Sequence, residues 1–454
     1  MRDILLTLII AGSLPVMFVR PFFGLLMWCW VSYMLPHRLT YGFAQDKPWA
    51  MIVGLTFLIS YLLSKEPKKL PITAVSVSLI VFVLWMNITH FAHPGGTFEF
   101  GQYSKVMKIQ LITFVVMAII TSRDRLVAML WVVVGSIAFY GVKGGIFTVL
   151  GGGQYTVWGP SGGFFEGNNE LALTLLMIIP LMRFLQMQLK VGSWQRHAMT
   201  GAMLLCMAAV LGSFSRGALL AAMSMGAFLW LKSRQKLAQG IVVVCVAVIG
   251  FTFMPERWHE RMMTITDNPT EKDASARGRI NAWTFAYLIA KEEPLGGGFG
   301  AYSTTNFLKY DPHDIALFDP TDFHDAHSIF FKILAEHGFI GLALFLLVGV
   351  CTWFSASRSM RLARRREDLR WVQDFGSMLQ VSLVAYVSGG LFLGLAYFDL
   401  YYHLVAMVVA LGAIVDAELK KAPVTRLPWE TTPVVEEGTP RFATMPGVNL
   451  PVRR

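Results

Sequence analysis

Long apolar runs recur along nearly the whole chain of 454 residues, and they restrict its fold more than any other feature. The runs have roughly 15 to 25 residues, and about 20 apolar residues in a helix span the hydrocarbon core of a bilayer. Inside a bilayer the backbone must satisfy its own hydrogen bonds, so only helices and closed barrels cross it. The runs lack the alternation of a strand. Together with a charged fraction of only 15%, they predict an all-α polytopic membrane protein.

The runs predict thirteen membrane spans, or twelve if the short first two are half-helices. Their ranges are 4–18, 22–35, 49–64, 71–90, 106–121, 125–150, 170–186, 199–212, 217–231, 239–254, 328–357, 374–397 and 401–417. We therefore expect N-terminal transmembrane helices at 1–254, a large periplasmic loop at 255–326 and C-terminal transmembrane helices at 327–417. Residues 418–454, rich in Pro, Thr and Glu, are expected to form a disordered cytoplasmic tail.

The distribution of charge predicts which loops face which side. The net charge of +10 comes from basic residues that gather in short loops, such as the one at 358–370. Such clusters mark cytoplasmic loops, and their position between apolar runs argues against a nucleic-acid partner. The loop at 255–326 has 7 Lys/Arg against 12 Asp/Glu, so we expect it on the opposite, exported side. The four cysteines are scattered through apolar runs without disulfide or zinc spacing.

Three arginines on the exported side are candidates for binding an anion. Arg216 lies in a tight turn between two apolar runs. Arg277 and Arg279 precede Trp283 and Tyr287 in a predicted amphipathic helix at the membrane surface. Arginine grips phosphate oxygens through two N–H groups and stays charged at any relevant pH, so the three could meet around the pyrophosphate of a lipid. The alternatives are a boundary arginine that reaches the headgroups and solvated loop charges.

Two further motifs lie in the exported loops. The segment PLGGGFG at 294–300 predicts a turn where the backbone can approach a ligand closely. It lacks the spacing of a nucleotide-binding loop. Asn168 and Asn169 open the span predicted at 170–186, where they could cap the helix or hydrogen-bond a sugar. We expect one of them to be the cap, and we retain Asn169 as a candidate for substrate binding.

His324 and His327 stand three residues apart at the entry of the span that begins near 328. A neutral histidine is a suitable general base, and Asp325 or Asp322 could orient it. If one helix runs through both histidines, their side chains point about 300° apart around its axis. A metal site of two histidines and two aspartates is one alternative, and interfacial histidines without a chemical role are another. Glu336 lies too deep to be the partner of His327, so we expect it to hydrogen-bond inside the bundle.

These motifs, in this order and topology, resemble the O-antigen ligase family of bacterial membrane glycosyltransferases. The resemblance runs from about 159 to 345 and rests on GFFEGNNELA, SFSRG, GRINAW, PLGGGFGAY and AHSIFFKILAEHGFIG. The segment SYMLPHRLTYGFA at 32–44 is similar, more narrowly, to O-glycosylation ligases encoded with exosortase systems.

The resemblance implies a GT-C type fold with about twelve spans in the bacterial inner membrane and an active site on the periplasmic side. It implies an inverting transfer of a glycan from undecaprenyl pyrophosphate to an acceptor hydroxyl on lipid A core or protein, without metal, nucleotide or other cofactor. His327 would be the base, although His324 is close enough to take its place. Arg216 and Arg279 would hold the pyrophosphate, with Arg277 as a third arginine.

Two other functions stay open. A polysaccharide polymerase would use the same lipid-linked donor and a similar architecture, and would differ in its acceptor. A lipid-glycan transporter or flippase would need charges that line a path through the membrane, and Lys143 is the one candidate for such a charge.

Overall fold

The computed structural model describes residues 1–421 except 94–95, 234, 264–273 and 311–324. Within these ranges the chain is helical and has no strand, and a helix occupies each of the thirteen predicted spans. These helices are α1 (Arg2–Val19), α2 (Pro21–Met34), α3 (Trp49–Leu63), α4 (Ala74–Ala92), α5 (Thr97–Ile119), α6 (Arg123–Leu150), α7 (Asn168–Met187), α8 (Trp194–Gly212), α9 (Arg216–Lys232), α10 (Lys236–Phe253), α14 (Ile329–Ala363), α15 (Arg370–Gly390) and α16 (Asp399–Lys420).

Seven of the described helices are long and apolar enough to cross a membrane, namely α1, α4, α6, α7, α10, α14 and α16. The prediction of an all-α polytopic membrane protein is confirmed. A count of twelve or thirteen spans stays a prediction, as does the division of the chain into segments. Most of the tail predicted at 418–454 lies outside the described residues, which end as α16 gives way to Lys421.

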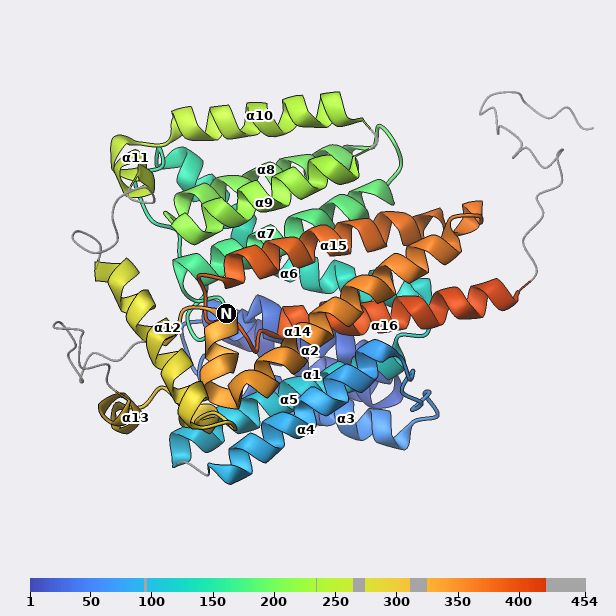
Figure 1. Ribbon diagram of the computed structural model, residues 1–454. Helices are drawn as coiled ribbons and strands as arrows, with labels where there is room; N and C mark the ends of the chain where they lie inside the picture. Colours follow the sequence, from blue (N-terminus) through green and yellow to red (C-terminus); the bar gives the residue numbers. More distant parts are fainter. Residues whose placement is uncertain (94–95, 234, 264–273, 311–324, 422–454) are drawn as a thin grey trace, which may run out of the picture.

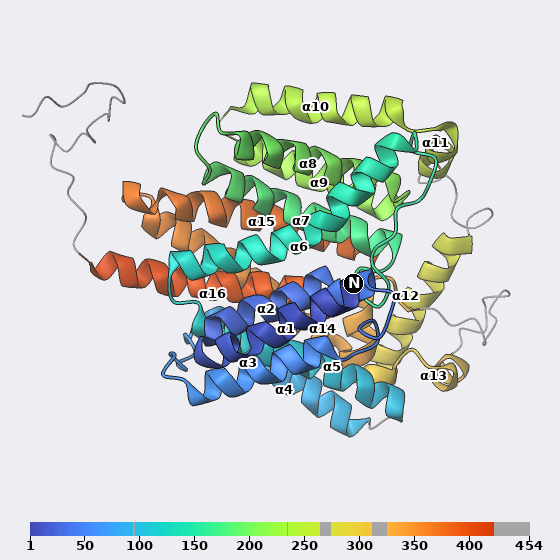
Figure 2. The same ribbon diagram turned by 180° about the vertical axis from the view of Figure 1, so that it is seen from behind.

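The helices lie side by side, and their turns gather at two opposite ends of the bundle (Figures 1 and 2). At one end, three additional helices occupy the loop predicted at 255–326: α11 (Glu256–Met263), α12 (Ala274–Glu292) and α13 (Thr304–Lys309). α12 is steeply inclined to the other helices and crosses this end of the bundle. The turn between α14 and α15 lies at the other end.

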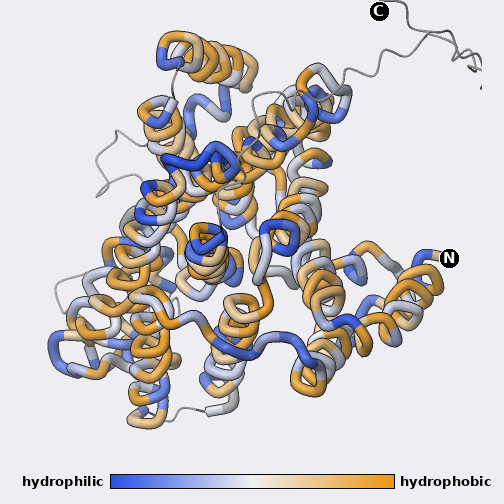
Figure 3. The backbone as a smooth tube through the Cα atoms, turned by 90° about the vertical axis from the view of Figure 1, so that its right-hand side faces the viewer, coloured by the Kyte–Doolittle hydropathy of each residue, from blue (hydrophilic) through white to orange (hydrophobic). Residues whose placement is uncertain are grey.

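The outer surface of the bundle is apolar. Figure 3 shows that even the outermost helices consist largely of hydrophobic residues. Large apolar side chains such as Leu62, Val242, Ile249 and Phe354 are more than half exposed. Large apolar side chains exposed over a whole surface are unfavourable in water but favourable in hydrocarbon. The surface therefore agrees with a bilayer around the helices.

Two helices form the centre of the bundle. α7 and α16 are buried along most of their length. α7 packs against α15, where the rings of Phe184 and Phe375 lie 5.0 Å apart. In α16 the ring of His403 forms a hydrogen bond of 2.6 Å with the hydroxyl of Tyr33 from α2. The α15–α16 connection, residues 391–398, borders the site described below.

α14 is broken at Gly338, although one continuous span was predicted at 328–357. Gly338 has a φ of 67° and a ψ of −173°, which are not helical. A Cβ atom at this position would lie 2.2 Å from the carbonyl oxygen of Pro294. On the other side of the contact, Gly297 N donates to Ala335 O at 2.8 Å. The PLGGGFG turn thus brings its backbone close to the break in α14.

Candidate active site

A small cavity of about 60 Å³ lies where α7, α9, α11, α12 and the α15–α16 connection meet. Arg216, Arg261, Arg279 and Asn169 line it, together with Ser215, Gly217, Phe392 and Leu393. The structure therefore brings together three candidates from the sequence, Arg216, Arg279 and Asn169, and adds Arg261. We refer to it as the arginine cavity.

Arg216 is the first residue of α9, directly after the tight turn that its sequence predicts. Phe214 has a left-handed φ of 56°, which reverses the chain after α8. Ser215 caps the helix, because its hydroxyl accepts a hydrogen bond from Ala218 N at 3.2 Å. The N-terminus of a helix carries a partial positive charge and presents N–H groups that lack helical acceptors. Arg216 thus adds a full charge where the backbone already favours an anion.

Arg261 is held beside this turn by α11. Its Nε donates to Phe214 O at 2.9 Å. In the same helix Trp258 is 2% exposed, and its Nε1 donates to Leu211 O at 3.0 Å. Our sequence analysis missed Arg261. The signal that could have found it is the segment ERWHERMM, where Trp258 and Met262 stand four apart and require an amphipathic helix.

The asparagines at the start of α7 do not cap it, and that prediction is wrong. Gly167 occupies the N-cap position and no side chain caps the helix. Because Asn168 is already the first helical residue, its side chain is directed to a neighbouring turn, where Nδ2 donates to Ser213 O at 2.8 Å. Asn169 lines the arginine cavity. The pair therefore ties α7 to the turn before Arg216 and leaves one amide at the cavity.

α12 is the helix that the spacing of Arg279, Trp283 and Tyr287 predicts. Arg279 is partly buried and lines the cavity. Tyr287 is exposed and contacts the ring of Phe339 edge-on. Arg277 belongs to the first turns of α12, but its side chain is not among those the structure describes, so its part in the site stays a prediction.

His327 is exposed and has a left-handed φ of 44°, which is uncommon for a residue other than glycine and costs energy. α14 begins after it, at Ile329, with Ser328 as N-cap. No single helix runs through both histidines, so the expected angle of about 300° between them does not apply. His324 and Asp322, on which the metal alternative also depends, lie outside the described residues.

Two contacts place the His327 segment, residues 325–328, next to the arginine cavity. Phe392 lines the cavity and packs on Gly217. A Cβ atom added to Gly217 would lie 3.0 Å from the Cβ atom of Phe392. Two residues later, a Cβ atom on Gly394 would lie 2.6 Å from Oδ2 of Asp325. The same short connection therefore touches the start of α9 and the His327 segment.

The second contact comes from α12. Trp283, one helical turn after Arg279, donates from Nε1 to Ala326 O at 2.8 Å. Its ring stacks on Phe331 at a centroid distance of 4.9 Å and an angle of 9°. Arg279 and the residue before His327 are thus fixed to one another through a single helical turn. His327 itself is not among the residues that line the arginine cavity.

Polar side chains that extend from Asp325 along α14 hold the His327 segment in place. Asp325 accepts from Ala326 N and from Lys332 Nζ, both at 2.8 Å. Lys332 Nζ lies 3.9 Å from Oε1 of Glu336, and the other carboxylate oxygen of Glu336, Oε2, accepts a hydrogen bond from the hydroxyl of Tyr397. Glu336 hydrogen-bonds inside the bundle, as predicted, and Asp325 anchors the segment to α14.

Lys143, the charge that favoured a transporter, lies at an exposed position of α6. It lines a separate cavity of about 340 Å³ together with Arg38 and Trp158.

Comparison with known proteins divides the chain into two parts. Residues 1–190 match a family of unknown function (DUF5935). Residues 201–346 match the family described as O-antigen ligase, and this range contains the three arginines of the cavity and the His327 segment. No curated protein matches the chain. The second match supports an enzyme of the ligase or polymerase type that acts on lipid-linked glycans. The chain thus contains an O-antigen ligase domain at residues 201–346, and its seven apolar helices indicate a multi-pass membrane protein.

Proposed function

We propose that the protein transfers a glycan from undecaprenyl pyrophosphate to an acceptor hydroxyl, on lipid A core or on a protein, at the periplasmic face of the bacterial inner membrane. One observation supports this more than any other. Arg216, Arg261 and Arg279 converge with the amide of Asn169 and the N-terminus of α9 at one cavity. One guanidinium group can bind two phosphate oxygens at once. A pyrophosphate has enough oxygens to bind all three arginines.

The reaction is a single displacement with inversion. The acceptor oxygen attacks the anomeric carbon and gives its proton to a neutral ring nitrogen of His327. The bond between that carbon and the pyrophosphate oxygen breaks, and its electron pair leaves with the pyrophosphate. The arginine cavity stabilises the charge that develops there, which is usually the largest contribution to such a rate enhancement. His324 is the second candidate for the base, and Arg277 is a further candidate for binding the pyrophosphate of the donor. No step in this scheme needs a metal or a nucleotide.

Transfer by the purified protein tests the proposal. The protein is mixed with a lipid-linked glycan donor and, in separate reactions, with lipid A core, an acceptor protein or a second lipid-linked glycan. Product on lipid A core or protein supports a ligase, and elongation of the lipid-linked glycan would assign a polymerase instead. Movement of the donor across vesicles without any transfer would assign a flippase and contradict the proposal.

Trp283→Phe should lower kcat about tenfold and leave KM for the donor unchanged. Phenylalanine keeps the stacking on Phe331 but removes the hydrogen bond to Ala326 O, so the base beside it loses its position. Steady-state kinetics with donor and acceptor varied separately measure the effect. The matched control is Tyr287→Phe, which removes a polar group one turn further along α12 and should change neither constant. Equal losses in both variants would show that α12 acts only through its stability.

The distribution of charge supports an exported position for the site. Glu292→Cys, at the end of α12, and Glu367→Cys, in the turn between α14 and α15, change exposed residues at opposite ends of the bundle. In cells, a membrane-impermeant maleimide should label the first variant directly and the second only after the inner membrane is permeabilised. Both variants carry Cys245→Ala, because Cys245 is the exposed native cysteine. The reverse labelling pattern would place the arginine cavity on the cytoplasmic side.

A further inference from the structure

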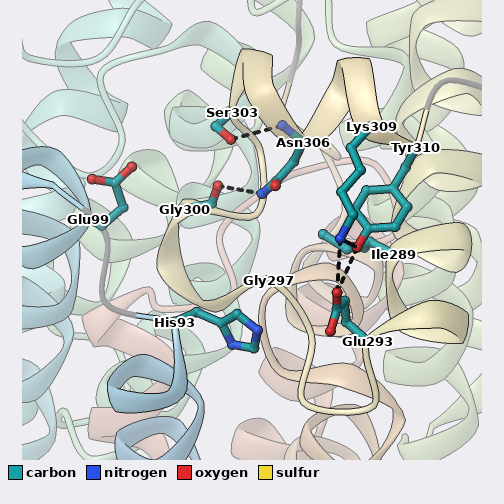
Figure 4. Close-up of a pocket in the computed structure, with 10 residues that line it drawn as sticks. All are labelled: His93, Glu99, Ile289, Glu293, Gly297, Gly300, Ser303, Asn306, Lys309 and Tyr310. Atoms are coloured by element: carbon teal, nitrogen blue, oxygen red, sulfur yellow. Dashed lines mark hydrogen bonds and ion pairs between the residues drawn. The ribbon is translucent and has the colours of Figure 1, made fainter.

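A second cavity, of about 320 Å³, lies at the far end of α12 from the arginine cavity (Figure 4). His93 at the end of α4 and Glu99 in the first turn of α5 form one wall, and the end of α12, the glycine-rich turn and α13 form the other. The polar side chains that line it include His93 and Glu99 on the first wall and Glu293, Ser303, Lys309 and Tyr310 on the second. We refer to it as the α13 cavity.

The two carboxylates of the α13 cavity differ in their surroundings. Glu293 accepts from Lys309 Nζ at 3.1 Å and from Tyr310 OH at 2.9 Å through a single oxygen. The hydrogen bond from Lys309, followed by that from Tyr310, lowers the pKa of Glu293, so the group is charged. Glu99 lies across the cavity, and within the described part of the chain it has no hydrogen bond (Figure 4).

A buried nitrogen adds a second unsatisfied group. Nδ1 of His93 is buried and has no hydrogen-bond partner among the described residues. A buried polar atom without a partner costs about 1–3 kcal/mol, so a hydrogen-bonding group that reached this nitrogen would lower that cost.

The chemistry of this lining favours a polyhydroxylated ligand. Two carboxylates disfavour a phosphate, and the polar lining disfavours an acyl chain. Among the described residues no group of three His, Cys, Asp or Glu side chains is arranged to hold a metal ion. A hydroxyl group both donates and accepts, so neighbouring hydroxyls of one sugar ring match carboxylate acceptors and the Lys309 donor at the same time.

We propose that the α13 cavity is a glycan subsite that binds a sugar ring remote from the reacting bond. Glu293 follows Arg279 by fourteen residues along α12, about 21 Å at roughly 1.5 Å per residue. That distance is too long for the sugar attached to pyrophosphate but suits a later sugar of the donor glycan or the glycan of the acceptor. The inference rests on the proposed function, and remote contacts of this kind can contribute to catalysis through binding.

Glu99→Gln tests the subsite, because Glu99 makes no hydrogen bond whose loss would disturb the described structure. Its matched control is Glu292→Gln, an exposed carboxylate on α12 beside Glu293 that does not line the cavity. KM is measured separately for donor and acceptor with the full-length protein. Binding of each free oligosaccharide, without lipid or pyrophosphate, is measured by calorimetry.

Glu99→Gln should raise one KM about tenfold, which corresponds to roughly 1.4 kcal/mol, and weaken binding of the matching oligosaccharide by the same factor. A rise in the donor KM assigns the subsite to the donor glycan, and a rise in the acceptor KM assigns it to the acceptor. Glu292→Gln should change neither constant. Transfer with both KM values and both oligosaccharide affinities unchanged in Glu99→Gln would overturn the subsite and leave the proposed function intact. If the wild type transfers nothing, the proposed function fails, and oligosaccharide binding alone decides whether the cavity holds a sugar.

Discussion

Arg216→Lys and Arg279→Lys should each lower kcat/KM for glycan transfer by roughly 10²–10³, although both variants keep the positive charge. Lysine is a point charge without the planar guanidinium group that binds two phosphate oxygens at once. Its single ammonium group therefore cannot replace both contacts. Arg216 and Arg279 line the cavity from two different helices, so each substitution removes contacts that the other cannot restore. Kinetics of the purified variants with a lipid-linked donor measure the loss.

Arg257→Lys is the matched control for this experiment. Arg257 lies in α11, with its guanidinium 6.0 Å from the centre of the Phe214 ring, but it does not line the arginine cavity. It should keep nearly full activity, whereas Arg261→Lys, in the same helix, should resemble the two variants above. Normal transfer by folded Arg216→Lys and Arg279→Lys would show that the arginines do not grip the pyrophosphate.

His327→Ala should abolish measurable transfer, with an expected loss of about 10²–10⁴ in rate, while donor binding stays nearly intact. The two effects separate because the base acts on the acceptor hydroxyl and the arginines hold the donor. The measurement is the transfer rate at saturating donor, together with donor binding to each variant.

His324→Ala is the partner experiment, because the two histidines stand close together and only His327 lies in the described part. It should cost much less, since His327 adjoins Ala326, which α12 holds in place. EDTA should leave the wild type unchanged. An active His327→Ala beside an inactive His324→Ala would move the base by three residues. Full activity in both variants, or loss of activity with EDTA, would rule out a metal-free histidine base.

The helices and the gathering of arginines could be predicted from the sequence because a bilayer permits few solutions. Apolar runs of membrane length must become helices, and the turns between them must lie at one side or the other. The sequence therefore predicts that Arg216 and Arg279 lie at the same surface of the membrane. The helix through Arg279 and Trp283 followed from their spacing of four.

The remaining features depend on contacts between distant segments. The break at Gly338 requires the backbone of Pro294, which lies far from it in sequence. Arg261 reaches the cavity only because Trp258 anchors α11 to the end of α8. The left-handed backbone at His327 likewise has no signature in the residues around it. Local patterns contain no information on which surfaces meet, so these features needed the structure.

An electron cryo-microscopy structure with a bound lipid-linked glycan would show whether the arginine cavity holds the pyrophosphate of the donor. We expect phosphate oxygens at about 2.7–3.2 Å from the guanidinium groups of Arg216, Arg261 and Arg279, with the first sugar directed toward the His327 segment. A donor whose pyrophosphate binds elsewhere, such as the cavity lined by Arg38 and Lys143, would contradict it.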